Sequence, residues 1–267
     1  ELTSRLQERL IPHYIRRVKD EVLGDLPERT EVPERVSLSP SQKKLYSRVR
    51  SAVHEGDQVA LGALQNLKQI CSHPDLYLDR MRPPEELVAR CPKLKATLSY
   101  LDEVHGRGEK ALVYTEYRHM QRILQEFTRD RFGVHAPILN GEVRTGRRHH
   151  EVQRFNTSSG FGAMILSPEA AGVGLNIVGA NHVIHYTRLW NPAKEKQATD
   201  RVYRIGQERP VTVFYPIAEG DGFSSLEEHL DELLTEKRKL AKDVVWPRDD
   251  LSVSSDMQSW LEDSEDV

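Results

Sequence analysis

The stretch from Ile165 to Gln207 decides the fold class of this chain and reads ILSPEAAGVGLNIVGANHVIHYTRLWNPAKEKQATDRVYRIGQ. It begins in a hydrophobic run at 163–167, which predicts a strand, and a glycine-rich loop follows. A second apolar run at 183–186 predicts another strand, which leads into Trp190-Asn191-Pro192. The polar segment from Ala193 to Gly206 predicts a basic helix. Strand, glycine turn, strand and basic helix are typical of an α/β domain that handles nucleotides.

The basic helix predicted after Pro192 carries two arginines. Arg201 and Arg204 are three residues apart, so on a helix they would share one face, with Gln197 one turn earlier. Two guanidinium groups side by side suit the spread negative charge of a phosphoryl group in transfer. A solvated basic face is the alternative interpretation of an arginine pair alone.

The whole arrangement is more specific than the pair. Gln-x3-Arg-x2-Arg-Ile-Gly-Gln follows Trp-Asn-Pro and Gly-x-Gly-Leu-Asn, and together they resemble the fifth and sixth helicase motifs of the Swi/Snf-type ATPases. That family is a group of superfamily-two DNA translocases that pump double-stranded DNA with ATP and remodel the proteins bound to it. The run LKQICSHP at 67–74 is similar to a signature in the helical insertion of the family's second lobe. The resemblance is closest to microbial members.

Two motifs of the family's first lobe are missing from the sequence. It contains no Gly-x4-Gly-Lys-Ser/Thr phosphate loop and no Asp-Glu-x-His-type box. The resemblance therefore implies a second RecA-like lobe, inactive alone, whose full-length enzyme binds ATP and Mg²⁺. No metal site and no cofactor are expected in this fragment. The resemblance assigns catalysis to Arg201, Arg204 and Gln197, and nucleotide coupling to the loop residues Gly172, Gly174, Leu175 and Asn176.

Strand and helix patterns alternate from Lys110 to Ile217, which predicts a parallel sheet covered on both faces. Ligands of such sheets lie beyond the carboxyl ends of the strands. The motif residues fall at those ends, in the segments 115–118, 140–141, 167–176 and 187–191. We expect a groove there for one backbone of the DNA duplex, lined by Arg118, Asn140, Gly141, Arg144, Trp190 and Lys194.

The expected fold is a three-layer RecA-like α/β domain with a helical insertion and a C-terminal helix. The predicted parts are an interlobe lead-in at 1–34, the helical insertion at 35–91, the helicase C-terminal lobe at 92–218, a bracing helix at 219–245 and an acidic tail at 246–267. The composition of residues 81–90 predicts an exposed loop. The tail is expected to be disordered, with a weak anchor or partner-binding element at Trp260 and Leu261 as the alternative.

The net charge is unevenly distributed along the 267 residues. Residues 219–267 hold 15 acidic and 5 basic side chains, which is a net charge of −10. Since the whole chain has a net charge of −3, the other 218 residues have a net charge of +7. A mildly basic body suits a polyanion. No apolar run is long enough to cross a bilayer, and Cys71 and Cys91 lack metal-ligand spacing. The first residue is Glu1, so we expect a fragment of a longer protein.

The expected partners are double-stranded DNA, the missing first ATPase lobe and a DNA-bound protein as remodelling substrate, without a membrane. The place of action would be the cytoplasmic nucleoid in a bacterium or the nucleus in a eukaryote. Two alternatives remain: a strand-separating DNA or RNA helicase lobe, and a non-catalytic DNA- or protein-binding module. The sequence also departs from the family pattern at four positions, which are Glu169, Ala171, Arg188 and Tyr203.

Overall fold

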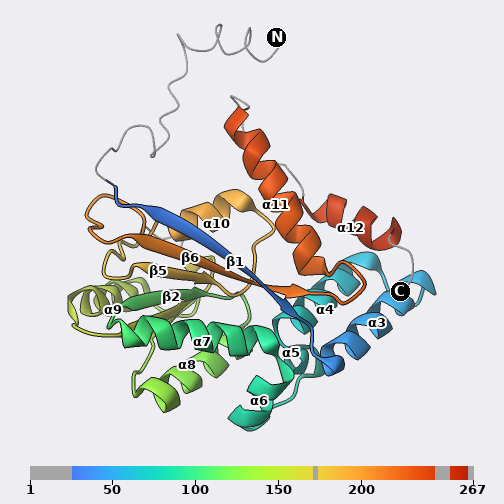
Figure 1. Ribbon diagram of the computed structural model, residues 1–267, viewed down its shortest axis with the longest axis horizontal. Helices are drawn as coiled ribbons and strands as arrows, with labels where there is room; N and C mark the ends of the chain where they lie inside the picture. Colours follow the sequence, from blue (N-terminus) through green and yellow to red (C-terminus); the bar gives the residue numbers. More distant parts are fainter. Residues whose placement is uncertain (1–25, 171–173, 244–252, 264–267) are drawn as a thin grey trace, which may run out of the picture.

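The computed structural model describes residues 26–170, 174–243 and 253–263 (Figure 1). Its centre is a six-stranded sheet in the order β1-β6-β5-β2-β4-β3. Every neighbouring pair runs parallel, as the sequence predicts. The strands are β1 (Arg29–Ser37), β2 (Lys110–Tyr114), β3 (Ile138–Leu139), β4 (Gly162–Leu166), β5 (His182–His185) and β6 (Val211–Glu219).

Helices cover both faces of this sheet. On one face, α7 (Pro92–Gly106) and α8 (Arg118–Phe132) pack against alternate residues of the central strands, such as Ala111 and Val113 of β2. On the other face, α9 (Thr145–Thr157) and α10 (Pro192–Thr199) pack against the intervening residues, such as Leu112 and Tyr114. All five residues of β2 are therefore buried, which explains its continuous apolar run.

A third core lies at one end of the sheet, where the C-terminal helices meet the insertion (Figure 1). The insertion contains α3 (Pro40–His54), α4 (Ala60–Ser72), α5 (Pro74–Leu78) and α6 (Pro84–Arg90). Ser39 caps α3 in a capping box, with Pro40 in the first turn. His73 caps α5 by accepting a hydrogen bond from the Asp75 amide, which is a structural role. Both cysteines are free and buried.

Two expectations for this region are wrong. Residues 84–90 form α6 and not a loop, because Pro83-Pro84-Glu85-Glu86 supplies a helix start: a proline at the first turn and carboxylates near the positive end of the helix dipole. Part of the acidic tail is also ordered. Residues Val253–Asp263 form α12, whose Met257 and Leu261 are fully buried against the third core.

The aromatic residue of the tail explains its order. Trp260 stacks on His229 of α11 (Leu226–Asp243), with ring centroids 4.8 Å apart and planes 10° apart. Lys237 of α11 also pairs with Asp256 at 2.7 Å. The apolar stripe of α12 therefore has a partner surface, which charge composition does not reveal.

The predicted boundary between the lead-in (1–34) and the helical insertion (35–91) falls inside β1. This strand pairs with β6 from Arg29 to Ser37 and completes the sheet of the lobe. The part of the predicted lead-in before residue 26 lies outside the described residues. Among the described helices, none is long and apolar enough to cross a membrane.

Candidate functional site

The carboxyl ends of the strands gather the predicted site residues at one edge of the sheet. Thr115 follows β2 and Thr187 follows β5, and their hydroxyl oxygens are 3.0 Å apart. Asn140 follows β3 and Ser167 follows β4. The residues that flank these strand ends form two groups: an arginine segment with the glycine loop, and a basic cleft.

The first group contains the two predicted catalytic arginines, but they do not lie on a helix. α10 ends at Thr199, and Arg201 and Arg204 lie in consecutive turns. The prediction of one continuous helix to Gly206 is therefore wrong. The physical reason is burial: Val202 and Tyr203 turn into the core, and Gly206 takes a φ of 95°.

The side chains of these arginines are left available by that turn. The Arg201 Nε atom is buried, and no acceptor among the described residues receives its hydrogen. Arg204 is half-buried, and no side-chain hydrogen bond or ion pair holds it within the described part of the chain. A buried guanidinium N–H without an acceptor is costly, and an anionic ligand would satisfy it. Gln197 is exposed on α10.

The predicted coupling loop contacts the arginine segment through the backbone. The amide of Ile177 donates to the carbonyl oxygen of Arg201 at 3.0 Å. Gly174 takes a φ of 53°, Leu175 is buried and Asn176 is exposed. Gly172 lies outside the described residues. The loop thus leaves Asn176 accessible while its neighbour is tied to Arg201.

Asn156 at the end of α9 clamps the far side of the same loop. Its Nδ2 atom donates to the Asn176 carbonyl at 2.9 Å, and its Oδ1 atom accepts from the Gly179 amide at 2.9 Å. Nothing in the sequence marks Asn156 as special, because it reads as an ordinary polar residue at a helix end. Its contact with residue 176 needs the tertiary structure.

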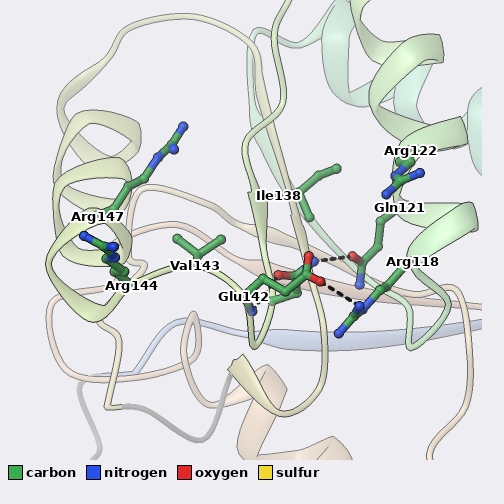
Figure 2. Close-up of a pocket in the computed structure, with 9 residues that line it drawn as sticks. Arg118, Gln121, Arg122, Ile138, Glu142, Val143, Arg144 and Arg147 are labelled. Atoms are coloured by element: carbon green, nitrogen blue, oxygen red, sulfur yellow. Dashed lines mark hydrogen bonds and ion pairs between the residues drawn. The ribbon is translucent and has the colours of Figure 1, made fainter.

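The second group is a cleft of about 580 Å³ with a basic lining (Figure 2). Arg118 and Arg122 of α8 lie on one side, and Arg144 and Arg147 at the start of α9 lie on the other. Three of the predicted DNA-contact residues, Arg118, Asn140 and Arg144, line this cleft, and Gly141 directly follows Asn140 in the chain. No motif in the sequence marks Arg122 and Arg147, which lie one helical turn from Arg118 and in the first turn of α9.

Buried hydrogen bonds fix the turn at the floor of the cleft. Asn140 donates to Gln121 Oε1 at 3.1 Å and accepts from the Glu142 amide at 3.1 Å. Gln121 donates to the Thr115 carbonyl, and Arg148 donates to the Asn140 carbonyl at 2.9 Å. Asn140 is only 9% exposed. The Asn140 amide is therefore used to shape the turn, and the surrounding arginines present the exposed charge.

Trp190 and Lys194 do not line this cleft. Trp190 packs against the third core with the Lys68 Nζ atom 5.0 Å above its ring centre, and Lys194 is exposed in the first turn of α10. They follow β5, which is separated from β3 by β2 and β4. Neighbouring strands are about 4.8 Å apart, so the two places are roughly 14 Å apart at the sheet.

A buried ionic cluster anchors α10 to the rest of the lobe. Arg188 forms two hydrogen bonds to Glu195, at 2.9 and 3.1 Å, and also pairs with Asp231 of α11. Arg238 of α11 contacts Glu195 at 2.5 Å. Burial alone would raise the Glu195 pKa, but these cations outweigh it and lower the pKa to about 2. Arg188, one of the four departures from the family pattern, thus has two carboxylate partners.

A buried histidine lies next to this cluster. His185 stacks on Tyr114 and on Tyr215, and its Nε2 atom is 2.9 Å from the Thr199 hydroxyl. Burial lowers the pKa of His185 from 6.5 to about 4, with Arg188 and Arg238 acting in the same direction against Glu195. His185 is therefore neutral at pH 7. No cluster of three or more metal-ligating side chains occurs in the part of the chain that the structure describes.

Comparison with known proteins identifies the lobe. Residues 92–206 match the family described as the helicase conserved C-terminal domain. The C-terminal domain of the Sulfolobus solfataricus SWI2/SNF2 ATPase superposes with a TM-score of 0.66 at 26% identity, covering 90% of this chain and 100% of that one. The chain is a homologue of the C-terminal lobe of the SWI2/SNF2 ATPases. Its fold is RecA-like, and the resemblance seen in the sequence is confirmed.

Two other comparisons extend over nearly all of this chain. The Sulfolobus solfataricus SWI2/SNF2 ATPase core in complex with double-stranded DNA has a TM-score of 0.68 at 31% identity, over 98% of this chain and 54% of that one. The Zorya protein ZorD of Escherichia coli O139:H28 is 40% identical over 270 residues, which cover 94% of this chain and 25% of ZorD. This chain spans about a quarter of the length of the curated relatives that it matches first.

Proposed function

We propose that this chain is the C-terminal lobe of an ATP-driven double-stranded DNA translocase that remodels protein–DNA complexes. The observation that carries the proposal is the junction at Arg201. Its backbone carbonyl is bonded to the glycine loop at Ile177, while its Nε atom has no acceptor within the described residues. Arg201 thus joins the glycine loop to a guanidinium group whose Nε atom lacks an acceptor within the described residues.

The lobe supplies Arg201 and Arg204 to the γ-phosphate of an ATP that the first lobe binds. ATP supplies the phosphoryl group that is transferred, and Mg²⁺ neutralises part of the charge on that group. This lobe alone holds neither ATP nor Mg²⁺. The two guanidinium groups stabilise the charge that spreads over the transferring phosphoryl oxygens. Gln197 lies in the last turn of α10, four residues before Arg201. The isolated lobe therefore has no ATPase activity.

The basic cleft and the exposed start of α10 form the DNA track of this lobe. Arg118, Arg144 and Lys194 are exposed, and phosphate contacts of such side chains position a duplex without reading its sequence. Trp190 supports the track from beneath, where it packs on the insertion. Binding is expected to be independent of base sequence and to weaken steeply with salt. The place of action is the nucleoid in a bacterium or the nucleus in a eukaryote.

Joining this lobe to its first lobe tests the proposal. The two-lobed protein should hydrolyse ATP faster with duplex DNA than with single strands or RNA, and should displace a third strand from a triplex without separating the duplex. Unwinding of a duplex with a free end would favour a strand-separating helicase instead. Absence of ATP hydrolysis with every nucleic acid would favour a non-catalytic binding module.

A further inference from the structure

The basic cleft contains one carboxylate, and its position is unusual for a surface that attracts phosphate. Glu142 lies between the two arginine-bearing walls and points towards Arg118 (Figure 2). Its Oε1 atom is 2.6 Å from the Arg118 Nη1 atom. The two side chains are 61% and 63% exposed, so neither is buried by the fold. The pair is therefore open to solvent.

The other three arginines of the cleft differ from Arg118. Arg122, Arg144 and Arg147 are exposed, and no hydrogen bond or ion pair to their side chains is found within the described residues. Arg118 is the exception among the four arginines of the cleft. Glu142 is therefore matched to one arginine and leaves three positive charges available.

The backbone fixes where Glu142 stands. Its amide donates to Asn140 Oδ1, and the neighbouring carbonyl of Asn140 accepts from the buried Arg148. Asn140 is in turn held by Gln121, whose own amide is bonded to the Thr115 carbonyl. The backbone from which the Glu142 side chain projects is thus fixed by a turn whose anchors are buried.

We propose that Glu142 is a built-in competitor for DNA phosphate, which occupies Arg118 until a duplex displaces it. This inference rests on the proposed function, because it assumes that the cleft receives a DNA backbone. A phosphodiester that reaches Arg118 must separate the Arg118–Glu142 pair and then lie near the displaced carboxylate. Both effects lower affinity, so Glu142 keeps this lobe from holding DNA tightly.

Weak holding has a use in a translocase. A motor that steps along a backbone must release each phosphate, and a nearby carboxylate shortens the time for which Arg118 stays bound. An exposed ion pair contributes little to stability, so it can open and close at small cost. The exchange of Glu142 for phosphate on Arg118 would then accompany each step.

The test compares two single substitutions in the full-length protein. Glu142→Gln keeps the size of the side chain and removes its charge. Glu103→Gln is the matched control, because Glu103 pairs with Arg107 on α7 with nearly the same exposures, 62% and 61%, and does not line the cleft. Both substitutions change the net charge by the same amount, so only the position of the charge differs.

Binding of a mixed-sequence duplex is measured by fluorescence anisotropy over a series of salt concentrations. Glu142→Gln should tighten binding roughly 3- to 10-fold. It should also steepen the slope of log K against log salt by about 0.9, because one more phosphate is neutralised without an internal partner. Glu103→Gln should change affinity less than about twofold, since a distant exposed charge is screened.

A double substitution separates competition for Arg118 from a general change of charge. In a protein that already carries Arg118→Gln, the gain from Glu142→Gln should shrink to that of the control. An equal gain with and without Arg118, or no gain at all, would overturn the competitor role while the DNA track stands. Failure of the unaltered protein to bind duplex DNA would instead overturn the proposed function.

Discussion

The backbone amide of Ile177 donates a hydrogen bond to the carbonyl oxygen of Arg201, with 3.0 Å between the nitrogen and the oxygen. Ile177 lies in the segment after β4, and Arg201 lies in the segment after α10. A displacement of the glycine loop would therefore reach Arg201 without any intervening side chain. Under the proposed function, this hydrogen bond is a short physical route between a DNA-facing loop and an ATP-facing arginine.

The first prediction concerns this route. In the two-lobed protein, Gly174→Val or Asn176→Ala should leave basal ATP hydrolysis largely intact and lower DNA-stimulated hydrolysis by about tenfold or more, a change of ~1.4 kcal/mol in the barrier. Gly174 has a φ of 53°, which a β-branched residue adopts only with strain. Translocation, measured by triplex displacement, should fall in parallel.

Gly160→Val is the matched control for the first prediction. Gly160 also has a positive φ, 74°, and open space where a side chain would be added, but it precedes β4 at the opposite end of the strand. It should cost similar stability and spare DNA stimulation. Loss of basal and stimulated rates in equal proportion in Gly174→Val would mean that the loop serves catalysis or packing.

The second prediction concerns the two arginines. Arg201→Ala and Arg204→Ala should each slow DNA-stimulated ATP hydrolysis by on the order of 10³ or more, as removal of an arginine finger does. ATP binding should weaken far less, because the phosphate loop belongs to the other lobe. Arg129→Ala on α8 is a suitable control, since Arg129 is 61% exposed and pairs only with the neighbouring Asp130 among the described residues. Near-normal turnover in either test variant would assign that arginine to structure.

The sequence predicts the sheet well for a physical reason. Parallel strands covered on both faces must be apolar throughout, so β2 and β4 are recognisable as short hydrophobic runs between helical patterns. The gathering of motif residues at one edge then follows from the parallel direction alone. The family resemblance, which the comparisons confirm, adds the expectations of a helical insertion and of a first lobe as partner.

What the sequence does not predict depends on tertiary contacts. The turn at Arg201 replaces the expected helix because Val202 and Tyr203 are buried in the core. Local helix propensity does not predict this burial. The order of α12 depends on the surface that α4 and α11 offer to Met257 and Leu261. Glu142 reads as a loop carboxylate until α8 brings Arg118 within 2.6 Å of it.

The third prediction is a loss of stability in mild acid. The folded-state pKa of His185 is lowered from 6.5 to about 4, chiefly by burial. The unfolded chain therefore takes up a proton near pH 6.5 that the folded chain refuses until about pH 4, and stability falls through that window. Between pH 7 and pH 5 this single group should cost roughly 2 kcal/mol of unfolding free energy.

His185→Gln should flatten that pH dependence, because glutamine can still bond the Thr199 hydroxyl but does not titrate. Chemical unfolding at pH 7 and pH 5 measures the difference. His149→Gln, at an exposed position on α9, is the control and should leave the pH dependence of the parent protein unchanged. Equal pH dependence in His185→Gln and the parent would show that other groups set the acid response.

The last prediction concerns the clamp between α9 and the coupling loop. A Cβ atom added at Gly179 would lie 2.7 Å from the Asn156 Cα atom and 2.8 Å from its Oδ1 atom. The first of these is a backbone atom of a helix, so it cannot move aside cheaply. Gly179→Ala should therefore destabilise the lobe by roughly 1–3 kcal/mol, the usual cost of overpacking. It should also displace Asn156 from the Asn176 carbonyl, and with it the loop that reaches Arg201.

Gly146→Ala on α9 is the matched control, because nothing lies within 4 Å of the added Cβ atom. At a helical position alanine is favoured over glycine, so this variant should gain up to roughly 1 kcal/mol. Denaturant unfolding gives the stability of both variants, and DNA-stimulated ATPase of the two-lobed protein gives the state of the loop. Gly179→Ala should lose DNA stimulation at a temperature where the protein is still folded. Asn156→Ala removes the hydrogen bonds of the clamp without causing the clash, so it should lose DNA stimulation with a smaller loss of stability. Full DNA stimulation in both variants would show that the clamp fixes the fold and has no part in coupling.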